Sequence, residues 1–172
     1  MSIEDELLQL ARDRELAIQG AFNSMLLDPP HIVRSQLRAY LSRQVDYGRI
    51  EHTNDTVPQL TSPGGGLEHL TCPRLQFLSG AKLEFDIVLE QHQGGWLVRR
   101  FFFHVRFPRP RRIGMVRIHL KPDITWRDPL AVPLCHLHVD GSRPHVPFPV
   151  MHPRLLLQFI CEQLEPNLGM GG

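Results

Sequence analysis

The side chains best suited to chemistry are concentrated near the C-terminus, between residues 133 and 164. Four histidines fall within these 32 residues, namely His136, His138, His145 and His152. Imidazole titrates close to neutral pH, so a histidine can act as a general acid or base, and its neutral form binds transition metals. We therefore expect the functional site to include this stretch.

Alternation along the strands determines which of these side chains can meet. In the segment 134–139, His136 and His138 alternate with Cys135, Leu137 and Val139, as in a strand with one buried face. The segments preceding it show the same period, which predicts an antiparallel meander. If strands pair in chain order, the face away from the core carries a defined set of polar and aromatic side chains. These are Trp96, Arg100, Phe102, His104, Arg106, Arg117, His119, His136 and His138.

The preferred interpretation is that this face binds nucleic acid and can cleave it. Arg100, Arg106 and Arg117 would hold phosphate oxygens through their guanidinium groups. Trp96 and Phe102 would stack on bases. General acid and base roles would then fall to three histidines, without a metal or any other cofactor. Those histidines are His119, His136 and His138.

Two alternatives remain open for the same histidines. In the first, His136 and His138 bind a metal ion with a third ligand from His119, His145 or Asp140, because imidazoles two apart on a strand project side by side. In the second, the histidines are half-buried, hydrogen-bonded and without chemistry. Cys135 adjoins His136 but points to the opposite face of the strand, so we expect it in the core and not as a nucleophile.

The elements that position these residues predict a single α+β domain over residues 1–172. Apolar spacing of three and four residues indicates a helical hairpin over 1–48, with one helix at 3–26 and a second that starts after Asp28-Pro29-Pro30. The prolines and glycines of 49–81 predict an irregular loop. An antiparallel sheet of about four strands is expected over 82–139, and a C-terminal helix packed on the sheet over 153–165.

Composition limits the function classes. The formal net charge is +1, so any basic surface must be local, and seven arginines lie between Arg99 and Arg117 without an intervening acid. Three cysteines without a CxxC pair are typical of a reducing compartment. The N-terminus lacks a signal-peptide core, and no apolar run reaches the length of a membrane span. We expect a cytoplasmic protein without a membrane partner.

The segment from Cys135 to Gly141, with Pro144 to Pro149 and the helix from Pro153, resembles the C-terminal half of small bacterial proteins that include toxin-like members of the TumE type. The resemblance covers about residues 82–165. It implies a bacterial setting linked to mobile elements, toxin–antitoxin pairs or antiviral defence. The expected partners are RNA or DNA, or a protein encoded in the same operon.

The overall plan is also similar to a ubiquitin-conjugating enzyme domain. The similarity lies in a leading helix, a meander with Phe107-Pro108 at a strand end, the histidine segment, and a closing helix that ends near Pro166-Asn167. Where that family has its thioester cysteine, this chain has His145 and Val146, and Cys135 comes too early. The resemblance therefore implies a non-catalytic scaffold for protein interaction within a multiprotein complex.

Overall fold

The computed structural model describes residues 27–52, 57–109, 112–120, 135–140 and 145–169, together with a few positions among the first 13. The predicted helix at 3–26 falls largely outside these residues. The described elements are α2 (Pro30–Asp46), β1 (Gln59–Gly64), β2 (Leu67–Gln76), β3 (Lys82–His92), β4 (Gly95–Arg106), β5 (Met115–Leu120), β6 (Cys135–Val139), β7 (Val146–Pro147), α3 (Pro153–Phe159), η2 (Ile160–Leu164) and α4 (Glu165–Gly169).

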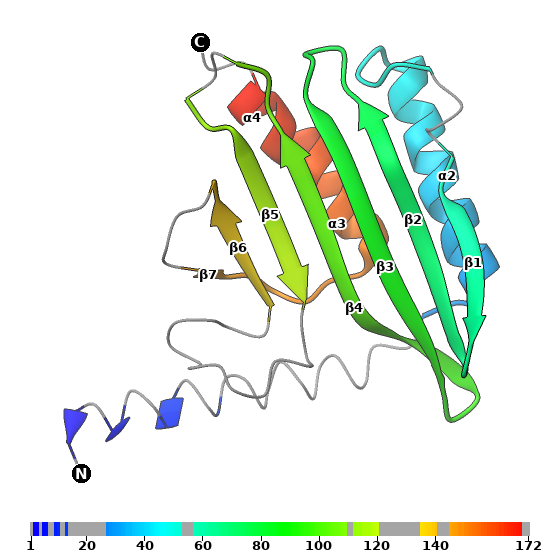
Figure 1. Cartoon of the computed structure of the whole chain (residues 1–172), viewed down its shortest axis with the longest axis vertical. Coiled ribbons are helices and arrows are strands. Elements are labelled where there is room, and N and C mark those ends of the chain that lie inside the picture. The colour runs from blue at the N-terminus through cyan, green and yellow to red at the C-terminus, as the bar shows by residue number, and fades with distance from the viewer. Residues whose placement is uncertain are drawn as a thin grey trace.

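All seven strands form one antiparallel sheet whose order follows the chain from β1 to β7. The prediction of about four strands is therefore wrong, although the four strands expected after residue 82 are present as β3 to β6. The helix α2 and the C-terminal helical segment cover the same face of the sheet (Figure 1). Their apolar side chains join those of the strands in one core, which includes Leu37, Phe85, Phe103, Ile118 and Leu156.

The predicted loop over 49–81 contains β1 and β2, and a bulge explains why the pattern was missed. Leu70, Cys72 and Leu75 are all buried in the core. The pairing of β2 with β3 shifts between Cys72 and Leu75, so the buried side chains are three residues apart instead of two. The shift occurs at Pro73 and Arg74, where proline is tolerated because ladder pairing is interrupted. β1 is an edge strand with mostly exposed side chains, which conceals its period.

A second bulge reverses the faces of β4 before Arg99, so the predicted faces are wrong for that part of the strand. The pairing of β3 with β4 matches Val88 with Arg100 but Leu89 with Val98, which leaves Arg99 as the extra residue. The alternation therefore reverses before Arg99. Val98 belongs to the buried core and Trp96 packs against it, so both lie on the helix side and not on the predicted outward face.

The helices are anchored by their own apolar stripes. In α2, buried side chains recur at Val33, Leu37, Tyr40 and Leu41, the spacing of one helical face. The guanidinium of Arg154 in α3 lies 4.0 Å from the centre of the Tyr40 ring, a cation–π contact that joins the two helices. The C-terminal helix is the predicted one and contains a π-helical turn at Ile160–Leu164.

Candidate functional site

The strand register brings the histidines into two rows across the outer face of the sheet, opposite the helices. One row pairs Phe102 of β4 with His119 of β5 and His119 with His136 of β6. The second row pairs His104 with Arg117, and Arg117 with His138. Because side chains alternate strictly between faces, all these residues project to the same side. The predicted grouping of His104, His119, His136 and His138 on one face is confirmed.

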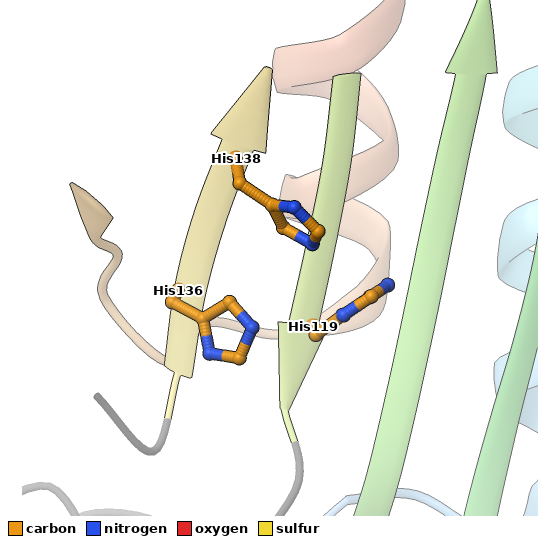
Figure 2. A group of neighbouring side chains, drawn as sticks. All are labelled: His119, His136 and His138. Atoms are coloured by element: carbon orange, nitrogen blue, oxygen red, sulfur yellow. The ribbon is translucent and has the colours of Figure 1, made fainter. Parts of the chain in front are cut away.

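Three of these histidines form a compact cluster that we call the histidine triad: His119, His136 and His138 (Figure 2). The rings of His136 and His138 project from β6 toward the ring of His119 on β5. One nitrogen from each ring lies within 4.8 Å of the others, and the ring centres are 5.0 to 5.5 Å apart. Only 6%, 2% and 8% of the three residues is exposed, so the predicted outward direction does not make them solvent-exposed.

His104 connects the triad to a carboxylate. Its Nδ1 lies 3.2 Å from Oε1 of Glu84, and its Nε2 lies 2.8 Å from Nε2 of His119. Burial lowers the pKa of His104, and the carboxylate of Glu84 opposes this effect. A carboxylate oxygen accepts a hydrogen bond, so Nδ1 of His104 is the donor to Glu84. The Nε2 of His104 can then accept from Nε2–H of His119.

This hydrogen bond determines which nitrogen of His119 could serve as a ligand. Its Nε2 is engaged by His104, and Figure 2 shows one ring nitrogen of His119 directed toward β4, away from His136 and His138. The Nδ1 of His119 is therefore the atom that could face a metal ion. Histidine ligands commonly donate their second N–H to a neighbouring acceptor, which fixes the tautomer and the ring orientation. His104 provides that acceptor here.

A fifth histidine closes the cluster at the sheet edge. The ring centre of His145 lies 4.7 Å from that of His136 and 4.9 Å from that of His138. His145 precedes β7, a two-residue strand that pairs with β6 through Val146 and Pro147. This short pairing returns the chain to the triad, so the ring of His145 packs against the rings of His136 and His138.

Asp140 stabilises the strands that carry the triad. Its Oδ1 accepts hydrogen bonds from the backbone N–H groups of Gly114 and Met115, each at 2.9 Å, and its carbonyl oxygen accepts from Nη2 of Arg117 at 2.7 Å. Its φ of 52° lies in the left-handed region, which Asp and Asn tolerate better than most residues. Asp140 is therefore a connection between β5 and β6, not the metal ligand that the sequence left open.

The other predicted site residues divide into two groups. Arg100 and Arg106 are exposed and Arg117 is half-buried, all from strand positions on the outer face. Phe102 is half-buried, with its ring centre 4.6 Å from that of His104. In contrast, Trp96 packs against the core and does not join this group. Glu84 contacts His104, and Asp86 lies 3.7 Å from His69.

Cys135 is fully buried on the core side, as expected from alternation. Its Sγ lies 3.8 Å from the carbonyl oxygen of Pro149. It is therefore separated from the triad by the thickness of the sheet. Two residues near the site were missed by sequence reasoning. Glu84 and Arg74 are these residues; both lie on or beside the outer face of paired strands.

Comparison with known proteins adds no relative to this description. No protein-family model matches the chain, and searches of curated proteins and of solved structures also find no match. The resemblances to TumE-type proteins and to ubiquitin-conjugating enzymes are thus neither supported nor contradicted. Among the described residues, no helix combines the length and the apolar character needed to cross a membrane.

Proposed function

We propose that this protein binds one divalent transition-metal ion through His119, His136 and His138. The observation that carries the proposal is the convergence of three buried imidazole nitrogens within 4.8 Å of one another. Imidazole is a preferred ligand of zinc, copper, iron and nickel. In a zinc site each ligand nitrogen lies about 2.0–2.1 Å from the ion. A rotamer adjustment of the three side chains would bring their nitrogens to this distance from one ion.

Zinc is the first candidate because three histidines supply a neutral nitrogen set that leaves one tetrahedral position for another ligand. An ion held by the triad would supply a bound water with a lowered pKa, which is a nucleophile near neutral pH. The proposed chemistry is therefore metal-assisted hydrolysis.

Nucleic acid is the substrate that we propose for this chemistry, as the arginines of the outer face suggest. Arg100 and Arg106 are exposed on the same side of the sheet as the triad. Guanidinium groups bind phosphodiester oxygens in a bidentate manner. Direct acid–base catalysis by the triad without a metal is the alternative chemistry, and it needs the same access of substrate to the buried rings. A role in bacterial toxin or defence systems rests on the TumE-type resemblance.

Titration of untagged, metal-free protein with zinc by isothermal calorimetry tests the metal site. We expect one ion per chain for the native protein, and loss of at least tenfold in affinity for His136→Ala and for His138→Ala. His92→Ala is the matched control, since His92 is exposed at the end of β3. Melting temperatures measured without metal show whether each variant folds. Equal zinc affinity in folded triad variants and in the control would refute the proposal.

A non-catalytic interaction scaffold is the alternative function. It predicts that a protein partner binds equally well to the native chain and to folded triad variants. Zinc binding that disappears with the triad, while partner binding remains, would assign separate roles to the histidines and to the rest of the surface.

A further inference from the structure

A second polar site lies on the outer face beside His104. It is a pocket of about 260 Å³ between β2, β3 and β4. Its lining residues are Pro73, Arg74, Lys82, Leu83, Glu84, His104 and Arg106. The volume is below the range of about 300–1,000 Å³ typical for drug-sized ligands, which fits a small group better than an extended molecule.

The bulge in β2 creates this pocket. Lys82 pairs with Arg106 and Glu84 pairs with His104, so these four residues are neighbours on one face of β3 and β4, on either side of the Leu83–Val105 pair. The register shift between Cys72 and Leu75 displaces Arg74 toward the same residues. A regular strand would pair with β3 along its whole length. The bulge in β2 interrupts this pairing and changes the direction of the Arg74 side chain.

The charge of the lining is strongly positive. Arg74, Lys82 and Arg106 are three cations, and all three are exposed. Glu84 is the only carboxylate in the lining, and it interacts with His104. Leaving His104 out, three positive charges and one negative charge give a net charge of +2. Among the described residues, no carboxylate forms an ion pair with any of these three cations.

We propose that this pocket binds the phosphate monoester group of a ligand. A phosphate monoester carries about −1.5 to −2 charges at pH 7 and presents three acceptor oxygens, which matches a lining of net charge +2 with three separate cationic donors. A carboxylate carries one charge and two oxygens, so it would leave one cation without a partner. Two guanidinium groups also suit the planar, bidentate contacts that phosphate accepts.

The inference deepens the proposed function because it names the group that anchors the substrate next to the metal site. His104 forms part of the pocket wall and also contacts His119 of the triad. A phosphate in the pocket would therefore be held on the far side of His104 from the metal. In a nucleic acid this would be a terminal phosphate, because an internal phosphodiester carries one charge and two non-bridging oxygens, and its binding would position the adjoining phosphodiester bond near the metal.

The same phosphate chemistry could come from inorganic phosphate, from a mononucleotide or from an oligonucleotide, and titrations distinguish these sources. Inorganic phosphate and adenosine monophosphate are titrated into ¹⁵N-labelled protein, with shifts followed in the backbone amides of β2 to β4. A single-stranded RNA with a 5′-terminal phosphate and a 3′-fluorescein label is titrated separately by anisotropy at several salt concentrations. Binding of the small phosphates alone indicates a mononucleotide-sized ligand, and tight salt-dependent RNA binding indicates a polymer.

Arg74→Ala and Arg106→Ala are the test variants, and Arg99→Ala is the control because its guanidinium pairs with Glu90 at an exposed site outside the pocket. We expect each test variant to weaken phosphate binding at least fivefold. With RNA, loss of one phosphate contact should reduce the slope of log K against log salt by about 0.7. Control-like binding by both test variants, or no phosphate-induced shifts in native protein, would overturn the proposal.

Zinc titration of the same variants separates this proposal from the metal site. Arg74→Ala and Arg106→Ala should bind zinc with native affinity, because neither side chain belongs to the triad. Loss of phosphate binding with intact zinc binding supports the pocket. Absence of zinc binding in native protein would refute the metal site. The phosphate titrations would then decide the pocket proposal independently.

Discussion

His119 has a different role from the other two members of the triad, because its Nε2 contacts His104 while its ring faces His136 and His138. If His119 binds a metal through Nδ1, its Nε2 must carry the proton and donate it to His104. His104 is then a positioning residue that sets the tautomer of a ligand. The carboxylate of Glu84 holds His104 in the matching orientation.

Replacing His104 should consequently reduce metal affinity without removing a ligand. For His104→Ala we expect zinc affinity to fall about 10- to 100-fold, the usual cost of losing a residue that orients a metal ligand. In His104→Gln the side-chain carbonyl oxygen can accept the hydrogen bond from His119, so affinity should recover in part. Competition with a chromophoric chelator measures both values.

His69→Ala provides the control for this prediction, since His69 lies in β2 and contacts Asp86 instead of the triad. Equal zinc affinity in His104→Ala and His69→Ala would show that His104 has no positioning role.

The thiols illustrate how burial determines reactivity at a single residue. Cys72, Cys135 and Cys161 are present as thiols and are completely buried. Burial is the largest cause that raises the pKa of Cys161, and the nearby Glu165 and Glu162 raise it further. The thiolate is the reactive form, so a raised pKa together with lack of access suppresses modification.

We therefore expect slow reaction of the native protein with Ellman's reagent at pH 8. Addition of guanidinium chloride should expose all three thiols, and the absorbance should then correspond to three per chain. A rapid phase of one thiol per chain in the native protein would contradict the described core.

At the scale of elements, Asp140 and the two bulges control how the strands present their side chains. The sequence motif Asp140-Gly141 indicates a turn, but it does not reveal that the carboxylate of Asp140 reaches back to the start of β5. This contact keeps β5 and β6 in the register that pairs His119 with His136. Sequence alternation could predict the face of each histidine, but not the hydrogen bonds that fix this register.

Asp140→Ala should destabilise the protein and loosen the triad. It removes the acceptor for two backbone N–H groups and places alanine at a positive φ, so we expect a loss of about 1–3 kcal/mol in the free energy of unfolding. Asp140→Asn keeps an oxygen acceptor and tolerates the left-handed conformation, so its loss should be smaller. Urea denaturation measures both, and similar losses for the two variants would argue against this role of the side chain.

The C-terminal helical segment is held to the sheet by a polar contact as well as by its apolar face. Oγ of Ser79, in the turn between β2 and β3, lies 2.5 Å from Oε1 of Glu165, which is buried. Removing the hydroxyl would leave a buried carboxylate with one hydrogen bond fewer. A buried group that loses its partner costs its desolvation free energy.

Ser79→Ala should therefore lower the free energy of unfolding by about 1–3 kcal/mol, as measured by urea denaturation. Ser35→Ala is the matched control, because the Ser35 hydroxyl is exposed and bonds to the carbonyl of His31 in its own helix. If the two variants have the same stability, the contact between Ser79 and Glu165 does not hold the helix.

For the whole molecule, the alternation of β3 to β6 outside the bulge at Arg99 made the mixed α+β class and the outer histidine face predictable. Leu83, Phe85 and Ile87 face the core, while Glu84 and Asp86 face the other side, as a period of two requires. The full sheet was not predictable because β1 is exposed on an edge and β2 contains a bulge. These are local departures from alternation, and pattern counting treats them as loops.

The sequence left the burial of the triad open. Alternation assigns His119, His136 and His138 to the face without the core, but it does not tell whether that face is covered, and all three are buried. The approach of His145 depends on the pairing of β7, which is only two residues long and has no periodicity to detect. The convergence of three buried imidazoles is the feature that favours metal binding.

A crystal structure of zinc-loaded, untagged protein, with anomalous diffraction recorded at the zinc absorption edge, tests the central claim most directly. We predict one anomalous peak between β5 and β6, about 2.0–2.1 Å from a ring nitrogen of each triad residue, with Nδ1 as the ligand atom of His119. The absence of a peak there, or a peak bound only by other residues, would contradict the account.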